Sequence, residues 1–171
     1  MKGYVQVYTG DGKGKTTAAF GLALRAVGAG LKVYIAQFVK GMRYGELDSV
    51  KKFPDQITLK QYGRDCFIHQ EPEQADVDAA RAGYEEVKKI VASGEYQLVI
   101  LDEANIATYY KLFSVEELIE LVNSRAENVE IVITGRKADP RIIEMADLVT
   151  EMREIKHYYQ KGVEAREGIE M

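Results

Sequence analysis

The stretch at residues 4–17 constrains the fold most, because it joins a short apolar segment to a loop crowded with glycine and lysine, YVQVYTGDGKGKTT. Alternating valine and tyrosine predict a strand over residues 4–8, and the alanine-rich and leucine-rich residues 18–29 predict a helix. The glycines between them let consecutive backbone amides turn toward an anion, and the positive end of the helix points to the same place. The stretch therefore predicts a phosphate-binding loop.

This loop fits the P-loop pattern G-x-x-x-x-G-K-[ST] with one departure, because Thr9 stands at the first glycine position and Gly10 follows it. In this pattern Lys15 neutralises phosphate, and the hydroxyl of Thr16 holds Mg²⁺. A glycine-rich hairpin turn is the alternative, but such a turn needs neither a lysine and a threonine nor a helix directly after it. The predicted nucleotide-binding residues in this loop are Thr9, Gly10, Asp11, Gly12, Lys13, Gly14, Lys15, Thr16 and Thr17.

Length and composition narrow the class of protein. A chain of 171 residues, 46% of them apolar, is expected to form a single domain over residues 1–171. The single cysteine, Cys66, excludes an internal disulfide, and a net charge of −4 argues against broad binding to nucleic acid or to a membrane surface. Without an apolar signal core or a long apolar run, the chain is expected to be soluble and cytoplasmic.

Strand and helix patterns alternate along the rest of the chain. Strands are expected at residues 32–39, 56–62, 96–101, 130–134 and 148–152, and helices at residues 46–53, 74–93, 115–126 and 140–145. Residues 63–72 show no period and are interpreted as a loop. The alternation predicts an α/β fold with a mostly parallel sheet covered by helices on both faces.

The carboxyl ends of parallel strands meet at one edge of a sheet, so this edge should collect the P-loop, the loop after Lys40, and Asp102 with Glu103. An apolar strand that ends in an acidic residue is what a P-loop protein uses to orient Mg²⁺ beside its threonine. Thr16, Asp102 and Glu103 are therefore predicted metal ligands, although a charged helix cap is the alternative for the two acids. The residues do not decide which carboxylate contacts the metal.

The residues alone do not assign the roles of Glu103 and Arg136. Glu103 has the chemistry to place a water molecule, and Arg136 follows a predicted strand, where an arginine is either a phosphate clamp or a surface residue. Spacing and chemistry alone thus predict an ATP-using P-loop protein. A regulatory P-loop ATPase and a small-molecule kinase, both of which release ADP, remain alternatives.

Several segments, in order along nearly the whole chain, resemble the ATP:corrinoid adenosyltransferase family of the P-loop type. These segments are GDGKGKTTAAFGLALRAVGAG, QFVKG with YGE close behind, VILDE, VITGR, ADLVTEM and KHYYQKGVEAREGIE. The resemblance implies a P-loop NTPase fold of the RecA-like kind. It also implies transfer of the 5′-deoxyadenosyl group of ATP to the Co(I) of a reduced corrinoid, either cobalamin or a precursor such as cobyrinic acid a,c-diamide, with release of triphosphate. This reaction belongs to adenosylcobalamin biosynthesis or corrinoid salvage.

The implied chemistry agrees with the residues present. Co(I) is itself the nucleophile, so a catalytic serine, cysteine or histidine is not required. Charge that builds on the leaving triphosphate would be stabilised by Lys15, the loop amides and Mg²⁺ or Mn²⁺, with Glu103 as the second catalytic residue. The resemblance further implies a nucleotide held in the reverse sense to most P-loop enzymes, a homodimer, and a flavodoxin-like or flavin reductase partner.

The corrinoid side of the site rests on resemblance alone. Some members of the family place phenylalanine and tryptophan against the lower face of the corrinoid, but this chain has no tryptophan. We expect residues 63–69 to close over that face, with Phe67 as the one aromatic residue of the stretch. The predicted corrinoid-binding residues are Lys40, Arg64, Phe67 and His69.

Overall fold

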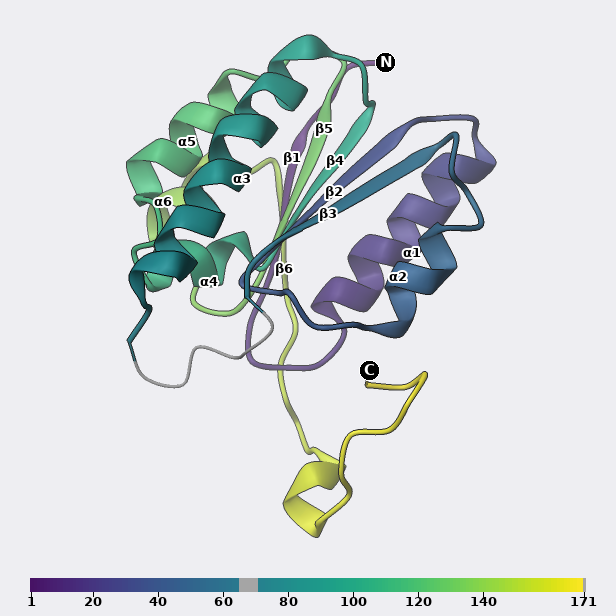
Figure 1. Cartoon of the computed structure of the whole chain (residues 1–171), viewed down its shortest axis with the longest axis vertical. Coiled ribbons are helices and arrows are strands. Elements are labelled where there is room, and N and C mark those ends of the chain that lie inside the picture. The colour runs from purple at the N-terminus through teal and green to yellow at the C-terminus, as the bar shows by residue number, and fades with distance from the viewer. Residues whose placement is uncertain (65–70, 171) are drawn as a thin grey trace.

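Strands and helices alternate along the chain, as the apolar pattern predicts (Figure 1). The computed structural model describes residues 1–64 and 71–170. The strands are β1 (Val5–Thr9), β2 (Val33–Phe38), β3 (Ile57–Tyr62), β4 (Leu98–Asp102), β5 (Glu130–Thr134) and β6 (Leu148–Glu151). The helices are α1 (Lys15–Gly28), α2 (Gly45–Val50), α3 (Gln74–Ser93), α4 (Ala104–Tyr109), α5 (Val115–Asn123) and α6 (Pro140–Met145), and a 3₁₀ turn covers Tyr158–Lys161.

In the described part of the chain these strands form one six-stranded sheet, ordered β3-β2-β4-β5-β1-β6, with every neighbouring pair parallel. Strand β5 lies between β1 and β4, and its residue Ile133 is paired with both Val7 and Leu101. The carboxyl ends of these three strands therefore lie side by side, which brings the P-loop close to Asp102. The structure confirms the predicted α/β class and its P-loop NTPase architecture of the RecA-like kind.

Helices cover both faces of the sheet, and the residues of β4 show how (Figure 1). Leu98 and Ile100 belong to an apolar cluster with α1, whereas Val99 and Leu101 belong to a second cluster with α3, α4, α5 and α6. All four side chains are almost fully buried. A central parallel strand buried on both faces reads as a continuous apolar run, which is why the sequence VILD revealed it.

The beginning of α1 differs from the prediction. A helix start at residue 18 is wrong, because α1 begins at Lys15, directly after Gly14 in a left-handed conformation with φ 115°. Lys15 and Thr16 thus belong to the first helical turn and not to the loop, and their side chains are held by a rigid element. Other predicted boundaries differ from the observed ones by up to three residues at either end.

Helix α4 was not predicted. It begins directly after Glu103, a residue whose φ of 59° is left-handed and therefore uncommon for glutamate. The helix has only six residues, and most of them are buried. It therefore lacks the amphipathic period that identifies a surface helix.

Strand β6 pairs with β1 at one edge of the sheet, and its four residues are exposed. Beyond it the chain leaves the body of the domain, forms the 3₁₀ turn and returns toward the P-loop (Figure 1). Among the described helices, none combines the length and the apolar character that crossing a membrane requires.

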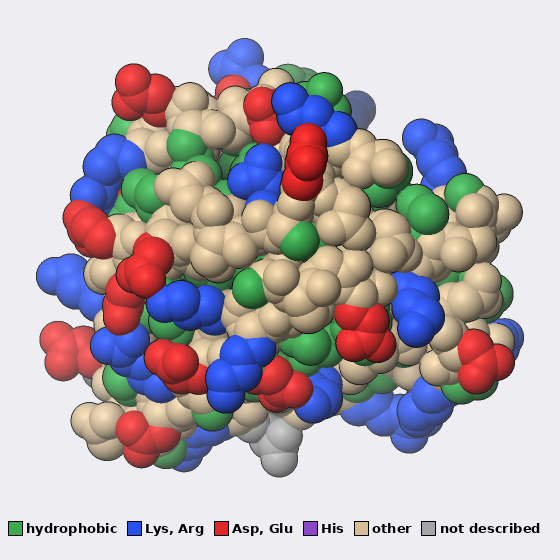
Figure 2. All heavy atoms as spheres, turned by 90° about the horizontal axis from the view of Figure 1, so that it is seen from above, with side chains coloured by type: hydrophobic (Ala, Val, Ile, Leu, Met, Phe, Trp, Pro, Cys, Tyr) green, Lys and Arg blue, Asp and Glu red, His purple; other side chains and the backbone are tan. Residues whose placement is uncertain are grey.

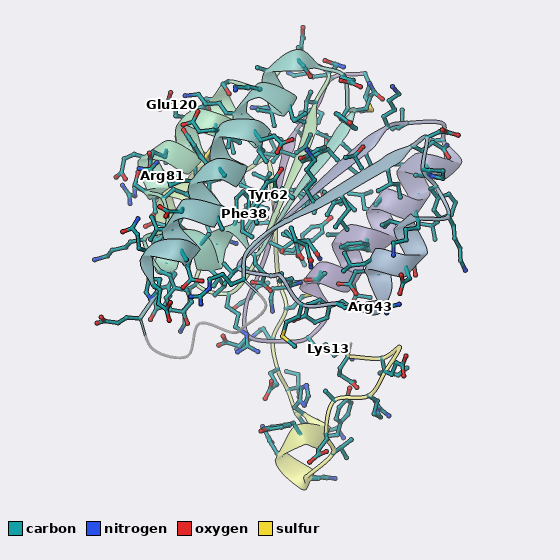
Figure 3. All side chains as sticks on the ribbon, viewed as in Figure 1. Lys13, Phe38, Arg43, Tyr62, Arg81 and Glu120 are labelled. Carbon is teal, nitrogen blue, oxygen red and sulfur yellow. The ribbon has the colours of Figure 1, made fainter. Side chains whose placement is uncertain are left out.

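The contact of α3 with β3 provides a test of the packing. A methyl group on Gly83 of α3 would overlap the ring of Tyr62, which itself stacks on Phe38 with 5.7 Å between ring centroids (Figure 3). We expect Gly83→Ala to lower the free energy of unfolding by about 1–3 kcal/mol, as overpacking does. Urea unfolding followed by circular dichroism measures this change.

Gly21→Ala is the matched control, because Gly21 is exposed within α1 and a methyl group there meets no atom within 4 Å. It should leave stability unchanged or raise it by up to ~1 kcal/mol through helix propensity. Equal effects of the two substitutions would contradict the described packing of α3 on β3.

Candidate active site

The P-loop holds Lys15 close to its own backbone. The Lys15 side chain is largely buried, and its Nζ donates a hydrogen bond of 2.6 Å to the carbonyl oxygen of Gly12. Burial, followed by the positive charge of Arg136, lowers the pKa of Lys15 below its ordinary value. Both causes penalise the ammonium form, so a phosphate group beside Lys15 would relieve a real electrostatic cost. This is the environment that anion binding at a helix N-terminus requires.

Asp102 joins the P-loop helix to the sheet. Thr16 donates from Oγ1 to Asp102 Oδ1 over 2.8 Å, and Thr134 of β5 donates to the same oxygen over 2.7 Å. Gln37 of β2 donates from Nε2 to Asp102 Oδ2 over 3.2 Å. The Asp102 side chain is fully buried. The predicted pairing of a strand-end acid with the P-loop threonine is therefore present, and Asp102, not Glu103, makes it.

Lys40 lies in the same cluster. Its Nζ is 2.7 Å from Asp102 Oδ2 and 3.4 Å from Thr16 Oγ1. Burial disfavours the ammonium of Lys40, but the adjacent Asp102 carboxylate outweighs burial, so the pKa of Lys40 lies above its ordinary value. Sequence reasoning assigned Lys40 to the corrinoid, a role that stays a prediction; the structure places its charge at the P-loop. The sequence predicted that the loop at Lys40 lies at the same edge of the sheet as the P-loop and Asp102, but it did not predict the ion pair between Lys40 and Asp102.

Glu103 has a different environment from its neighbour Asp102. Its backbone N–H donates to Thr134 Oγ1 over 3.0 Å, and its side chain lines the same cavity as Lys15 and Arg136. Burial, and then the negative charge of Asp102, raise the pKa of Glu103 above its ordinary value. The two adjacent acids thus have different environments. Asp102 is buried and hydrogen-bonded within the protein, whereas Glu103 lines the cavity.

The cavity has a volume of about 680 Å³. It is lined by residues 11–17 of the P-loop, the start of α2, Glu103, Arg136 and parts of the segment after β6, residues 152–170, here called the tail. Four cations and five acids line it together: Lys13, Lys15, Lys40, Arg136, Asp11, Glu46, Glu103, Glu154 and Glu170. At the opposite end of the molecule acidic and basic side chains are also interspersed (Figure 2). It is therefore the P-loop amides and Lys15 at the start of α1, and not the overall charge of the lining, that suit the cavity to a phosphate group.

The tail contributes a wall of this cavity that residue-by-residue reasoning missed. Lys13 donates from Nζ to Glu170 Oε1 over 2.9 Å and to the carbonyl oxygen of Ile169 over 3.0 Å, and Figure 3 shows it beside the tail. The hydroxyl of Tyr158 and the guanidinium of Arg166 also bond Glu170. His157 lines the cavity as well.

Of the remaining predicted corrinoid residues, Arg64 lies in the described part of the chain and contacts α3. Arg64 forms an ion pair with Glu73 at the start of α3, with 2.6 Å between NH1 and Oε2. Phe67 and His69 lie outside the described residues, so their proposed contacts stay predictions, as does closure of residues 63–69 over the corrinoid.

The donor set suits Mg²⁺ better than a metal that prefers nitrogen or sulfur. Among the described residues there is no group of three or more histidine, cysteine, aspartate or glutamate side chains able to hold a metal on their own. Mg²⁺ commonly takes one or two protein oxygens and completes its shell with water and substrate phosphates. The Thr16 hydroxyl and the Asp102 carboxylate, 2.8 Å apart at the P-loop, match this requirement.

A strand–loop–helix phosphate cradle with an acidic strand end bonded to its threonine defines a P-loop nucleotide-binding protein. Comparison with known families narrows the class further. The family model described as ATP:corrinoid adenosyltransferase BtuR/CobO/CobP matches residues 1–171, and the chain belongs to this family. The resemblance inferred from the sequence segments is thereby confirmed.

Individual relatives agree with this assignment. A protein of Pseudomonas aeruginosa named corrinoid adenosyltransferase is 35% identical over 170 residues, which cover 99% of this chain and 84% of the relative. A protein of Escherichia coli K12 with the same name is 36% identical, with 99% and 86% covered. Corrinoid adenosyltransferase CobA of Salmonella typhimurium shows the same identity and coverage.

Lys15 is the first residue to test. We expect Lys15→Ala to weaken ATP binding at least about tenfold, because a hydrogen bond to a charged group contributes roughly 1.5–3 kcal/mol. Isothermal titration calorimetry measures the affinity, and circular dichroism verifies that the fold persists. Lys52→Ala, on an exposed position after α2, is the control and should bind ATP as the unaltered chain does. Unchanged ATP affinity in Lys15→Ala would refute the role of the cradle.

Proposed function

We propose that this protein transfers the 5′-deoxyadenosyl group of ATP to the Co(I) of a reduced corrinoid and releases triphosphate. The observation that carries the proposal is the family match along residues 1–171, joined to a P-loop whose Lys15, Thr16 and Asp102 are in place. The relatives described above are named for the same activity. The alternatives, a regulatory ATPase or a small-molecule kinase, have no support from the comparisons.

The reaction balances without a protein nucleophile. The electron pair of Co(I) forms the cobalt–carbon bond at C5′, while the bond from C5′ to the triphosphate oxygen breaks and its electrons leave with triphosphate. The protein must therefore stabilise charge that grows on the leaving group. We propose that Lys15 and the P-loop amides do this, and Arg136, which lines the same cavity, is proposed to assist them.

Mg²⁺, or Mn²⁺ in its place, is proposed to be held by Thr16 and Asp102, with Glu103 close by. When bound, such an ion neutralises part of the charge of the polyphosphate. Glu103 is proposed as a catalytic residue that holds a water molecule beside the phosphates, because its carboxylate faces the cavity and does not share the bonds that fix Asp102.

Further features are proposed on the strength of family resemblance. They are a homodimer and contact of the corrinoid with Lys40, Arg64, Phe67 and His69. A cytoplasmic location is proposed from composition, because the single cysteine, Cys66, suits a reducing compartment. Formation of Co(I) requires an electron donor, so a flavodoxin-like or flavin reductase is the proposed partner. The nucleotide is proposed to lie in the reverse sense, with its 5′ carbon toward the cobalt.

Product analysis tests the proposed function directly. The protein is incubated with ATP, Mg²⁺ and chemically reduced cobalamin, and separately with reduced cobyrinic acid a,c-diamide. We expect the light-sensitive spectrum of a cobalt–carbon bond and triphosphate in equal amount. ADP without a cobalt–carbon bond would overturn the proposal in favour of an ATPase or a kinase.

Glu103→Gln tests the second catalytic residue. Because the side chain faces the cavity, we expect kcat to fall at least about tenfold, equivalent to ~1.4 kcal/mol in the barrier, while ATP affinity changes little. Steady-state kinetics and calorimetry measure the two quantities. Glu144→Gln, which alters an exposed carboxylate of α6 outside the cavity lining, is the control with near-normal kcat. A loss of ATP affinity with kcat unchanged would show that Glu103 binds nucleotide without a catalytic role.

A further inference from the structure

Both oxygens of Asp102 are occupied by groups of the protein. In the described part of the chain Oδ1 accepts hydrogen bonds from Thr16 and Thr134, and Oδ2 accepts them from Gln37 and Lys40. An incoming cation would have to share or replace one of these donors, since a carboxylate oxygen offers two lone pairs. The identity of the donor that gives way therefore decides how readily Asp102 can bind a cation.

Lys40 is the donor best able to move. Gln37 and Thr134 are fully buried on the central strands β2 and β5, and Thr16 lies in the first turn of α1. Lys40 instead follows β2 on a loop, and its side chain retains 15% exposure. Among the described donors to Asp102 it alone carries a positive charge. A cation that approaches Asp102 would therefore repel Lys40 and leave the neutral donors in place.

The backbone is built to aim Lys40 at Asp102. Val39 has φ 61°, a left-handed conformation that is a genuine outlier for a β-branched residue and is therefore strained. This turn is held by close backbone packing, because a methyl group on Gly63 would lie 2.5 Å from the backbone nitrogen of Lys40. Strain of this kind persists where the surrounding structure enforces it, and it clusters at functional sites.

A displaced Lys40 would remain within the cavity that it lines. Its Nζ already lies 5.5 Å from the centroid of the Tyr44 ring, whose face can hold an ammonium group. Glu46 also lines this side of the cavity. The ammonium is thus available to a polyphosphate once it leaves Asp102, which would link cation binding to nucleotide binding.

We infer that Lys40 is a resident counter-ion of Asp102, displaced when a divalent cation binds, and that it thereby sets the metal affinity of the site. This inference rests on the Thr16–Asp102 metal site of the proposed function. Lys40 acts through Asp102 and is a positioning residue. Its presence should make cation binding weak without nucleotide and stronger with it, because a bound polyphosphate gives the released ammonium a partner.

Binding of Mn²⁺ to the full chain without nucleotide or corrinoid tests this inference, with free Mn²⁺ measured by electron paramagnetic resonance. Lys40→Met should bind Mn²⁺ at least about tenfold more tightly than the unaltered chain, a difference of ~1.4 kcal/mol. Lys51→Met, which removes an exposed lysine paired with Asp48, is the matched control and should not change the affinity. In addition, ATP should strengthen Mn²⁺ binding less in Lys40→Met than in the unaltered chain.

Two more variants complete the test. Lys40→Gln keeps a hydrogen-bond donor without the charge, so it should also bind Mn²⁺ more tightly and serves if Lys40→Met does not fold. Adding Asp102→Asn to either variant should abolish the gain. Equal or weaker Mn²⁺ binding in the folded Lys40 variants, or a gain that survives Asp102→Asn, would overturn the inference. These readings involve no corrinoid, so they are independent of whether the unaltered chain forms a cobalt–carbon bond.

Discussion

The carboxylate of Asp102 is the interaction on which the arrangement of the site depends. It receives hydrogen bonds from α1 through Thr16, from β5 through Thr134 and from β2 through Gln37, while itself ending β4. One buried side chain thus fixes the P-loop helix relative to three strands. Because an uncompensated charge at this depth would be very costly, any shift of these elements that broke the bonds would be strongly disfavoured.

The hydrogen bonds of Asp102 fix the positions of the site residues more than they stabilise the fold. Burying an ion pair costs desolvation free energy that its attraction only partly repays, so Asp102 with Lys40 is weak support for the fold itself. The hydrogen bond from Thr16 to Asp102 instead fixes the first turn of α1. This turn carries both the Thr16 hydroxyl and, one residue earlier, the Lys15 ammonium. Preorganised groups stabilise developing charge without having to reorganise as the reaction proceeds.

The sequence was sufficient to predict the parallel sheet, the P-loop and the acid at the end of β4, because apolar runs and glycine spacing are local signals. It was insufficient where the backbone adopts angles that its residues disfavour. Val39 and Glu103 both have left-handed φ values, and residue preference argues against each of them. The environments of Lys40 and Glu103 follow from these turns. The bond between Lys13 and Glu170 joins distant residues, which no local pattern encodes.

The strand order has a consequence for how the site comes into being. β1, which carries the P-loop, has β5 and β6 as its neighbours in the sheet, and these strands span residues 130–151. Because β1 precedes β5 and β6 in the chain, it finds these partners only after the segments between them have been synthesised. Until then the cradle lacks the framework that shapes it, and such distant pairings also slow folding. A nucleotide that binds only the completed site would favour the folded state by mass action, so substrate supply and maturation of the protein are coupled.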